Sequence, residues 1–153
     1  MHFNVKEDII QLTPVWKGER FEDGRPKVSD EDIAELKKLT QEQIWESLWE
    51  NDYKNQFESH LMRIHEDDRK LIGRAVTAAY IPSRPDLFDV VEEIGHSEGR
   101  KGTHNLWVVD KLVDGDVAVV DMYDKVYEGT FIGGNLSTAI STNTKTGGAV
   151  IWG

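Results

Sequence analysis

Residues 114–153 read DGDVAVVDMYDKVYEGTFIGGNLSTAISTNTKTGGAVIWG, and this stretch decides the fold. The short apolar run at 117–120 follows a turn signal and is typical of a buried strand, which an aspartate closes. A Gly-Gly pair at 133–134 then opens a helix. A second Gly-Gly pair at 147–148 ends that unit before another apolar run, 149–152. The pattern predicts a strand–helix–strand unit of an α/β fold.

The start of this helix is the expected binding site. Ligands of α/β units gather outside the carboxyl ends of strands and at helix N-termini, where free N–H groups and the helix dipole attract anions. Asp121 and Asp124 lie nearby in the sequence and offer oxygen ligands for a hard divalent cation. A Gly-Gly pair before a helix is also a common steric necessity, so spacing alone leaves both interpretations open.

A further strand and helix are predicted just upstream. Residues 71–81, LIGRAVTAAYI, have the β-branched and apolar bias of a strand. Asp86 is predicted to cap a helix over residues 87–94, and the glycine-rich residues 95–105 are predicted to form a polar loop. Residues 71–153 would thus form the N-terminal part of an α/β core. The helix has one apolar face, made of Leu87, Val90, Val91 and Ile94.

Two segments precede this core. Prolines and glycines interrupt residues 1–28, which we expect to be an irregular arm that wraps over another surface. Residues 29–70 are predicted to be a helical segment. Ser29 is placed to cap its first helix, and Thr40 with Gln43 makes a capping-box pattern at the start of a second.

Composition excludes several classes of function. The chain has 153 residues, 28 acidic against 18 basic, and a net charge of −10, which opposes nucleic-acid binding. Cysteine is absent, which excludes disulfides, thiolate catalysis and cysteine-based metal sites. No apolar run approaches the ~20 residues that span a bilayer, and the N-terminal sequence lacks the pattern of a secretory signal. We expect a cytoplasmic protein without nucleic-acid or membrane partners.

Several glycine-centred segments resemble the core of the RraA-like family. This family includes the regulator of ribonuclease activity A and the class II 4-hydroxy-4-methyl-2-oxoglutarate/oxaloacetate aldolases. The resemblance covers essentially the whole chain, is most specific in the core, and extends to the N-terminal arm of a longer-chain branch. The segments that carry it are GDV at 115–117, GGNLSTA at 133–139, GGAV at 147–150, GRAVTA at 73–78, ESL at 46–48, WKGERF at 16–21 and DGRPKV at 23–28.

The resemblance implies a swivelling β/β/α layered fold, assembled as trimers or hexamers with active sites at subunit interfaces. In the family's aldolases Mg²⁺ binds the 2-keto acid and stabilises the pyruvate enolate, and Mn²⁺ is an alternative metal here. Glu46 and Asp86 become candidates for polar contacts or proton transfer, although from the residues alone Glu46 reads as a solvated helix carboxylate. The amides that would hold the substrate carboxylate belong to Gly134, Asn135, Leu136 and Ser137.

The sequence departs from the family at its end. Family members continue past the last strand into an Asp-Gly-x-x-Arg-Asp motif, whose Arg binds the carboxylate and whose Asp holds the metal. This sequence stops at Gly153. We expect a companion chain or C-terminal segment to supply that motif and the closing strands. The alternative is a partial member that binds without catalysing.

The leading functional hypothesis is therefore a divalent-metal-dependent lyase or aldolase. It would act on a 2-keto acid or sugar-derived acid through an enolate intermediate, in a site that another polypeptide segment or subunit completes. A second hypothesis is a non-catalytic protein-binding regulator like the ribonuclease modulator. A purely structural subunit is the third.

Overall fold

The structure is a computed structural model that describes residues 5–65, 68–124 and 130–153. The chain divides into two compact units, Met1–Lys54 and Asn55–Gly153. The first is helical, and the second contains the sheet. The protein is thus of the mixed α/β class, as predicted. Of the helices in the described ranges, none is long and apolar enough to cross a membrane.

Two helices of the first unit start where the sequence predicts. α2 (Asp30–Leu36) begins after Ser29, whose hydroxyl oxygen accepts a hydrogen bond from the Asp32 amide at 3.0 Å. α3 (Gln41–Glu50) begins after Thr40 with both hydrogen bonds of the capping box in place. Both start signals are therefore confirmed. They could be predicted from the sequence because a capping residue satisfies backbone groups within three residues of itself.

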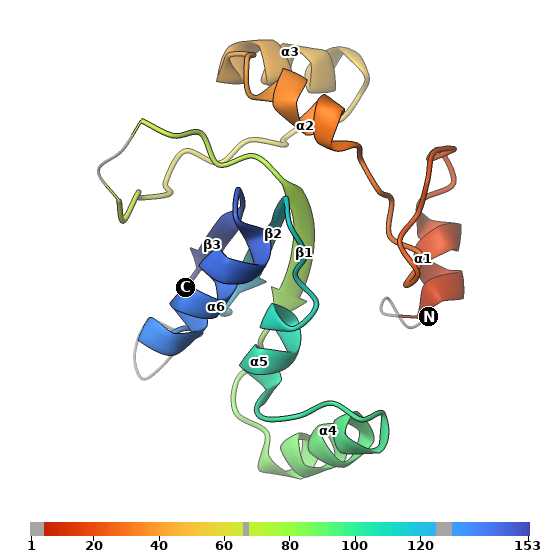
Figure 1. Cartoon of the computed structure of the whole chain (residues 1–153), viewed down its shortest axis with the longest axis vertical. Coiled ribbons are helices and arrows are strands. Elements are labelled where there is room, and N and C mark those ends of the chain that lie inside the picture. The colour runs from red at the N-terminus through yellow and green to blue at the C-terminus, as the bar shows by residue number, and fades with distance from the viewer. Residues whose placement is uncertain (1–4, 66–67, 125–129) are drawn as a thin grey trace. The chain divides into compact units, whose positions relative to one another are not determined.

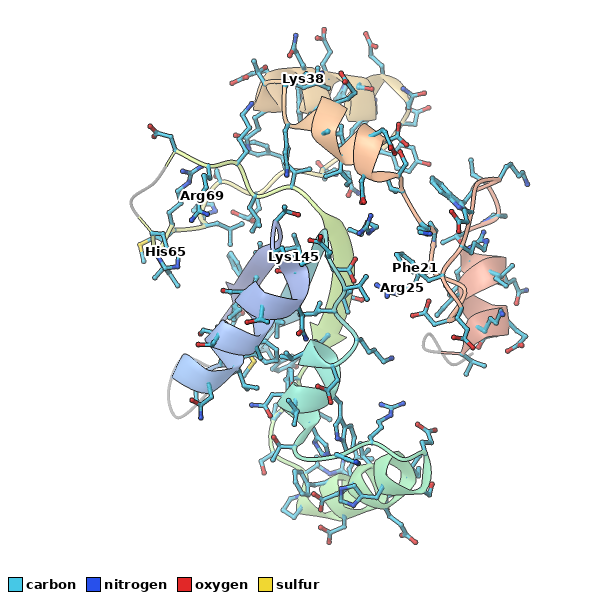
Figure 2. All side chains as sticks on the ribbon, in the orientation of Figure 1. Phe21, Arg25, Lys38, His65, Arg69 and Lys145 are labelled. Atoms are coloured by element: carbon cyan, nitrogen blue, oxygen red, sulfur yellow. The ribbon has the colours of Figure 1, made fainter. Side chains whose placement is uncertain are left out.

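The N-terminal segment contains a helix that the sequence analysis missed. α1 (Lys6–Leu12) has two acidic residues in its first turn, which suits the positive end of the helix dipole. The prolines and glycines that suggested an irregular arm begin only at Pro14. Farther on, the guanidinium of Arg25 lies over the ring of Phe21, 4.9 Å from its centroid (Figure 2).

The second unit is built on a three-stranded parallel sheet in the order β1-β2-β3 (Figure 1). β1 (Arg74–Ala79), β2 (Asp116–Asp121) and β3 (Gly148–Trp152) confirm the three predicted strands. β1 is shorter than the predicted 71–81. Its partner β2 has only six residues, so the ladder between them runs from Arg74 opposite Asp116 to Ala79 opposite Asp121.

One face of this sheet carries the hydrophobic core. α5 (His104–Val109) and α6 (Gly134–Thr144) pack on it. The predicted helix after the Gly-Gly pair is confirmed as α6, and it places Ile140 at 3% exposure in the core. The buried members of the core are Val76, Val109, Leu112, Ala118, Val120, Phe131 and Ile140.

The region between β1 and β2 is more helical than predicted. α4 spans Pro85–Ser97, and no side chain caps it, so the prediction that Asp86 caps this helix is wrong. Arg84 holds the cap position and Pro85 starts the helix, which suits a residue without an N–H.

The predicted loop over 95–105 is also too long, because only residues 98–103 connect the two helices. Gly95 belongs to α4 and is buried. A Cβ at this position would lie 2.2 Å from Cη2 of Trp107. The glycine therefore permits a close contact between α4 and α5, and it does not break the helix.

The second face of the sheet and its two outer strands are open in the described part of the unit. Thr77 and Trp152 on this face are exposed, and Val119 and Val150 are only partly buried. β1 and β3 each pair with β2 on one side only. Parallel sheets are normally covered on both faces, so this face is a place where a further layer fits.

Candidate functional site

The predicted carboxylate-binding amides lie together in the first turn of α6. Gly133 holds the cap position in an extended conformation, with φ −119° and ψ −170°, and no side chain caps the helix. The Ser137 amide donates to the Gly133 carbonyl oxygen at 3.0 Å. The amides of residues 134–136 precede the first intrahelical hydrogen bond and point out of the helix end, where an acceptor can bind them.

The space at this helix start decides between the two interpretations of the Gly-Gly pair. Among the described residues, a Cβ added at Gly133 or at Gly134 would meet no atom within 4 Å. Neither glycine has a φ in the left-handed region. Neither the packing of the described residues nor the backbone conformation therefore requires glycine at these two positions, which argues against the steric explanation. What the two glycines do provide is the lack of a side chain, which leaves the amides of the first turn open to a ligand.

The carboxyl ends of the strands bring further polar groups to the same edge of the sheet. Asp121 ends β2, and one of its carboxylate oxygens accepts from the Tyr123 amide at 2.7 Å. The Asp124 carboxylate accepts from Nε1 of Trp152, also at 2.7 Å. Tyr123 and Asp124 have φ values of 58° and 53°, so the chain turns sharply through two left-handed residues as it leaves β2.

A shallow cavity of about 310 Å³ lies on the open face of the sheet near these strand ends. Its walls are mostly apolar, and the residues with polar side-chain groups among them are Thr77, Asp121 and Trp152. The residues that line it are Thr77, Ala78, Ala79, Val119, Val120, Asp121, Val150 and Trp152.

The described residues do not form a metal site by themselves. Among them, no group of three or more His, Asp or Glu side chains is placed to hold an ion. Asp121 and Asp124 already accept hydrogen bonds from Tyr123 and Trp152. Mg²⁺ prefers octahedral oxygen coordination, so these two carboxylates alone do not complete a metal site.

The two predicted proton-transfer candidates lie elsewhere. Glu46 is exposed on α3 in the first unit. Asp86 is in the first turn of α4, where its carboxylate accepts from Nε of Arg84 at 2.9 Å and from Nη2 at 2.5 Å. These hydrogen bonds lower the pKa of Asp86, which favours the carboxylate and makes Asp86 a hydrogen-bond acceptor near neutral pH.

Tyr80 is a residue of this edge that the sequence analysis missed. It follows β1 directly, and its ring packs against Phe131 with centroids 5.9 Å apart. Its hydroxyl is buried without a hydrogen-bond partner among the described residues. Burial raises the pKa of Tyr80 to about 12. A tyrosine near the end of the predicted strand 71–81 was the available sequence signal.

Replacing Tyr80 by phenylalanine is expected to leave the free energy of unfolding at pH 7 unchanged or raise it by about 1 kcal/mol, because it removes an unpaired polar group. In the wild type the folded state holds the phenolic proton more tightly than the unfolded state, whose pKa is near 10. Stability from this group is therefore lost as the pH rises from about 10 to about 12. Urea unfolding of both proteins at pH 8 and pH 11 measures the difference, and equal losses in the two proteins would contradict the assignment.

Comparison of the chain with protein-family models, with curated proteins and with solved structures finds no match.

Proposed function

We propose that the protein is a divalent-metal-dependent lyase or aldolase that acts on a 2-keto acid or a sugar-derived acid. The chain would bind the substrate carboxylate at the start of α6, and a companion chain or C-terminal segment would complete the site. The working form would be a cytoplasmic trimer or hexamer. The proposal combines the geometry of α6 with the resemblance of the glycine-centred segments to the RraA-like family.

One observation carries the proposal: α6 starts with amides that no side chain caps, in open space, after a strand of a parallel sheet. Such a helix start binds anions, because its N–H groups and the positive end of the helix dipole both point toward the ligand. The amides of Gly134, Asn135 and Leu136 would orient a planar carboxylate. Ser137 would contribute less than its sequence position suggests, because its amide already donates to Gly133.

The open face of the sheet supports the completing segment. Thr77 and Trp152 are exposed there, and both outer strands have an unpaired edge within the described unit. A layer packed on this face would bury apolar side chains and bring new residues next to Asp121. A bound Mg²⁺ or Mn²⁺ would supply Lewis-acid chemistry, with its main ligands on that segment.

A single backbone donor tests the carboxylate site. Gly134→Pro removes the first amide of α6, and the fold tolerates the change because Gly133 is already extended and a Cβ at Gly134 meets nothing within 4 Å. A hydrogen bond to a charged group contributes about 1.5–3 kcal/mol. We expect the affinity of the complete assembly for pyruvate to fall about tenfold to a hundredfold in this variant.

Gly134→Ala is the matched control, since it adds a Cβ in the same place and keeps the amide. Isothermal titration with pyruvate and thermal unfolding of both variants measure affinity and stability separately. Equal affinity in the two variants, with stability preserved, would show that the amide does not hold the ligand.

The reaction class has its own test. The complete assembly is expected to release pyruvate or a related keto acid from a panel of 2-keto and sugar-derived acids, and to lose this activity with a chelator. Retained activity in the chelator would exclude the metal dependence. A complete assembly that is inactive on the panel, yet forms a stable complex with an RNA-processing enzyme, would favour the regulator instead.

A further inference from the structure

α4 packs against α5 within the second unit. Gly95 lies under the ring of Trp107, and the ring of Phe88 packs against His104 with centroids 4.6 Å apart. Trp107 and His104 both belong to α5, which lies between α4 and the sheet (Figure 1).

The side of α4 next to the one that contacts α5 carries an exposed apolar stripe. Its four side chains are spaced i, i+3, i+4 and i+7, so they fall within about 100° of arc. None of them belongs to the core or packs against it among the described residues. This outer stripe consists of Leu87, Val90, Val91 and Ile94, whose exposed fractions are 38%, 50%, 38% and 51%.

The charges around the outer stripe are of one sign. α4 contains four acidic residues and neither lysine nor arginine. The two arginines that flank it are engaged, since Arg84 pairs with Asp86 at 2.5 Å and Arg100 pairs with Glu98 at 2.6 Å. The helix therefore presents apolar side chains beside an acidic border, to which Glu93 contributes.

We propose that the outer stripe is a docking surface for an amphipathic helix of a basic protein partner. The i, i+3, i+4, i+7 spacing forms a ridge that fits between the side chains of a second helix. Lysines or arginines beside the partner's apolar face would meet the acidic border. This interaction is independent of the carboxylate site on α6 and goes beyond the proposed catalytic function.

The same charges disfavour two other occupants. A second copy of α4 would bring one acidic border near another in a chain whose net charge is already −10. A lipid surface is disfavoured because helices that lie on membranes carry lysine and arginine on their polar face, whereas this helix carries acids.

Designed peptides test both the apolar and the charged part of the surface. The probes are three fluorescent 18-residue helical peptides: one with a leucine stripe flanked by lysines, one with the same stripe flanked by glutamates, and a scrambled lysine peptide. Anisotropy titrations of the full chain are expected to show the tightest binding for the first. Ile94→Asp is expected to weaken that binding about tenfold or more, because it places a charge within the apolar contact. Val15→Asp, at a valine exposed by 78%, is the matched control and should change nothing.

The charge on the border is tested by Glu93→Lys. This variant is expected to bind the lysine peptide more weakly and the glutamate peptide more tightly than the wild type does. Both differences in affinity should shrink at high salt. Glu31→Lys on α2 makes the same change in net charge elsewhere and should leave both affinities within about twofold. Equal binding of all three peptides, or no binding, would overturn the proposal. If the chain self-associates and Ile94→Asp abolishes this, a second copy is the occupant. If the chain binds anionic vesicles and Ile94→Asp abolishes this, a lipid surface is the occupant. Either result would also overturn the proposal.

Discussion

Replacing Asp116 by alanine is expected to lower the free energy of unfolding of the second unit by about 3–5 kcal/mol. The Asp116 side chain is fully buried at the start of β2. One carboxylate oxygen accepts from Nε of Arg74 at 3.1 Å, and the other accepts from the Val113 amide at 3.1 Å. The side chain of Arg74 is itself only 8% exposed, so removal of the carboxylate takes a charge-assisted hydrogen bond away from a buried guanidinium.

A double-mutant cycle separates the ion pair from the other contacts. Asp116→Asn keeps an acceptor for the Val113 amide and should cost less than alanine. Arg74→Met removes the cation, and the combination with Asp116→Asn should cost less than the sum of the two single changes, because the ion pair between them can be lost only once. Urea unfolding followed by circular dichroism measures all four proteins. Additive losses would show that Arg74 and Asp116 do not interact across the β1–β2 ladder.

Local signals in the sequence predict much of this fold. The apolar runs at 117–120 and 149–152, and the helix after the Gly-Gly pair, are confirmed within a residue or two. The caps at Ser29 and Thr40 are confirmed as well. In each case the stabilising groups lie a few residues apart, so the sequence alone contains the whole interaction.

The features that the sequence did not predict depend on contacts between distant segments. Gly95 looked like the end of a helix, and only the ring of Trp107 shows why a glycine stands inside α4. Arg74 and Asp116 are 42 residues apart, so their pairing follows from the strand register and no local pattern signals it. The burial of Tyr80 likewise depends on Phe131 from a later segment.

In the candidate site, too, local features were predicted from the sequence and contacts between distant segments were not. The amides at 134–136 are neighbours in one helical turn, so the glycine pattern was enough to place them together. Glu46 and Asp86 are single carboxylates on separate helices, and their roles depend on arrangements that no spacing rule describes. They remain predictions, whereas the pairing of Asp86 with Arg84 is a local feature that the sequence analysis overlooked.

The amino edge of the sheet, opposite the candidate site, is closely packed around β2. The turn before β3 contacts the backbone of β2 there, since a Cβ on Gly147 would lie 1.7 Å from the Asp116 carbonyl oxygen and 2.9 Å from Cβ of Thr144. Thr144 is fully buried and its carbonyl oxygen accepts from the Gly115 amide at 3.1 Å. The end of α6 and the starts of β2 and β3 therefore meet at one point that has no room for a methyl group.

Gly147→Ala is accordingly expected to lower the free energy of unfolding by about 3 kcal/mol, at the upper end of the usual cost of overpacking. The cost is high because the obstructing atom is a backbone carbonyl in a strand, which cannot rotate away as a side chain would. Gly134→Ala adds the same methyl group at the open end of α6, where it meets nothing within 4 Å, and should be neutral or stabilising by up to about 1 kcal/mol. Chemical denaturation of the two variants compares them directly. If Gly147→Ala proved as stable as Gly134→Ala, the turn before β3 could not approach Asp116 this closely, and the β2–β3 register that positions α6 would be wrong.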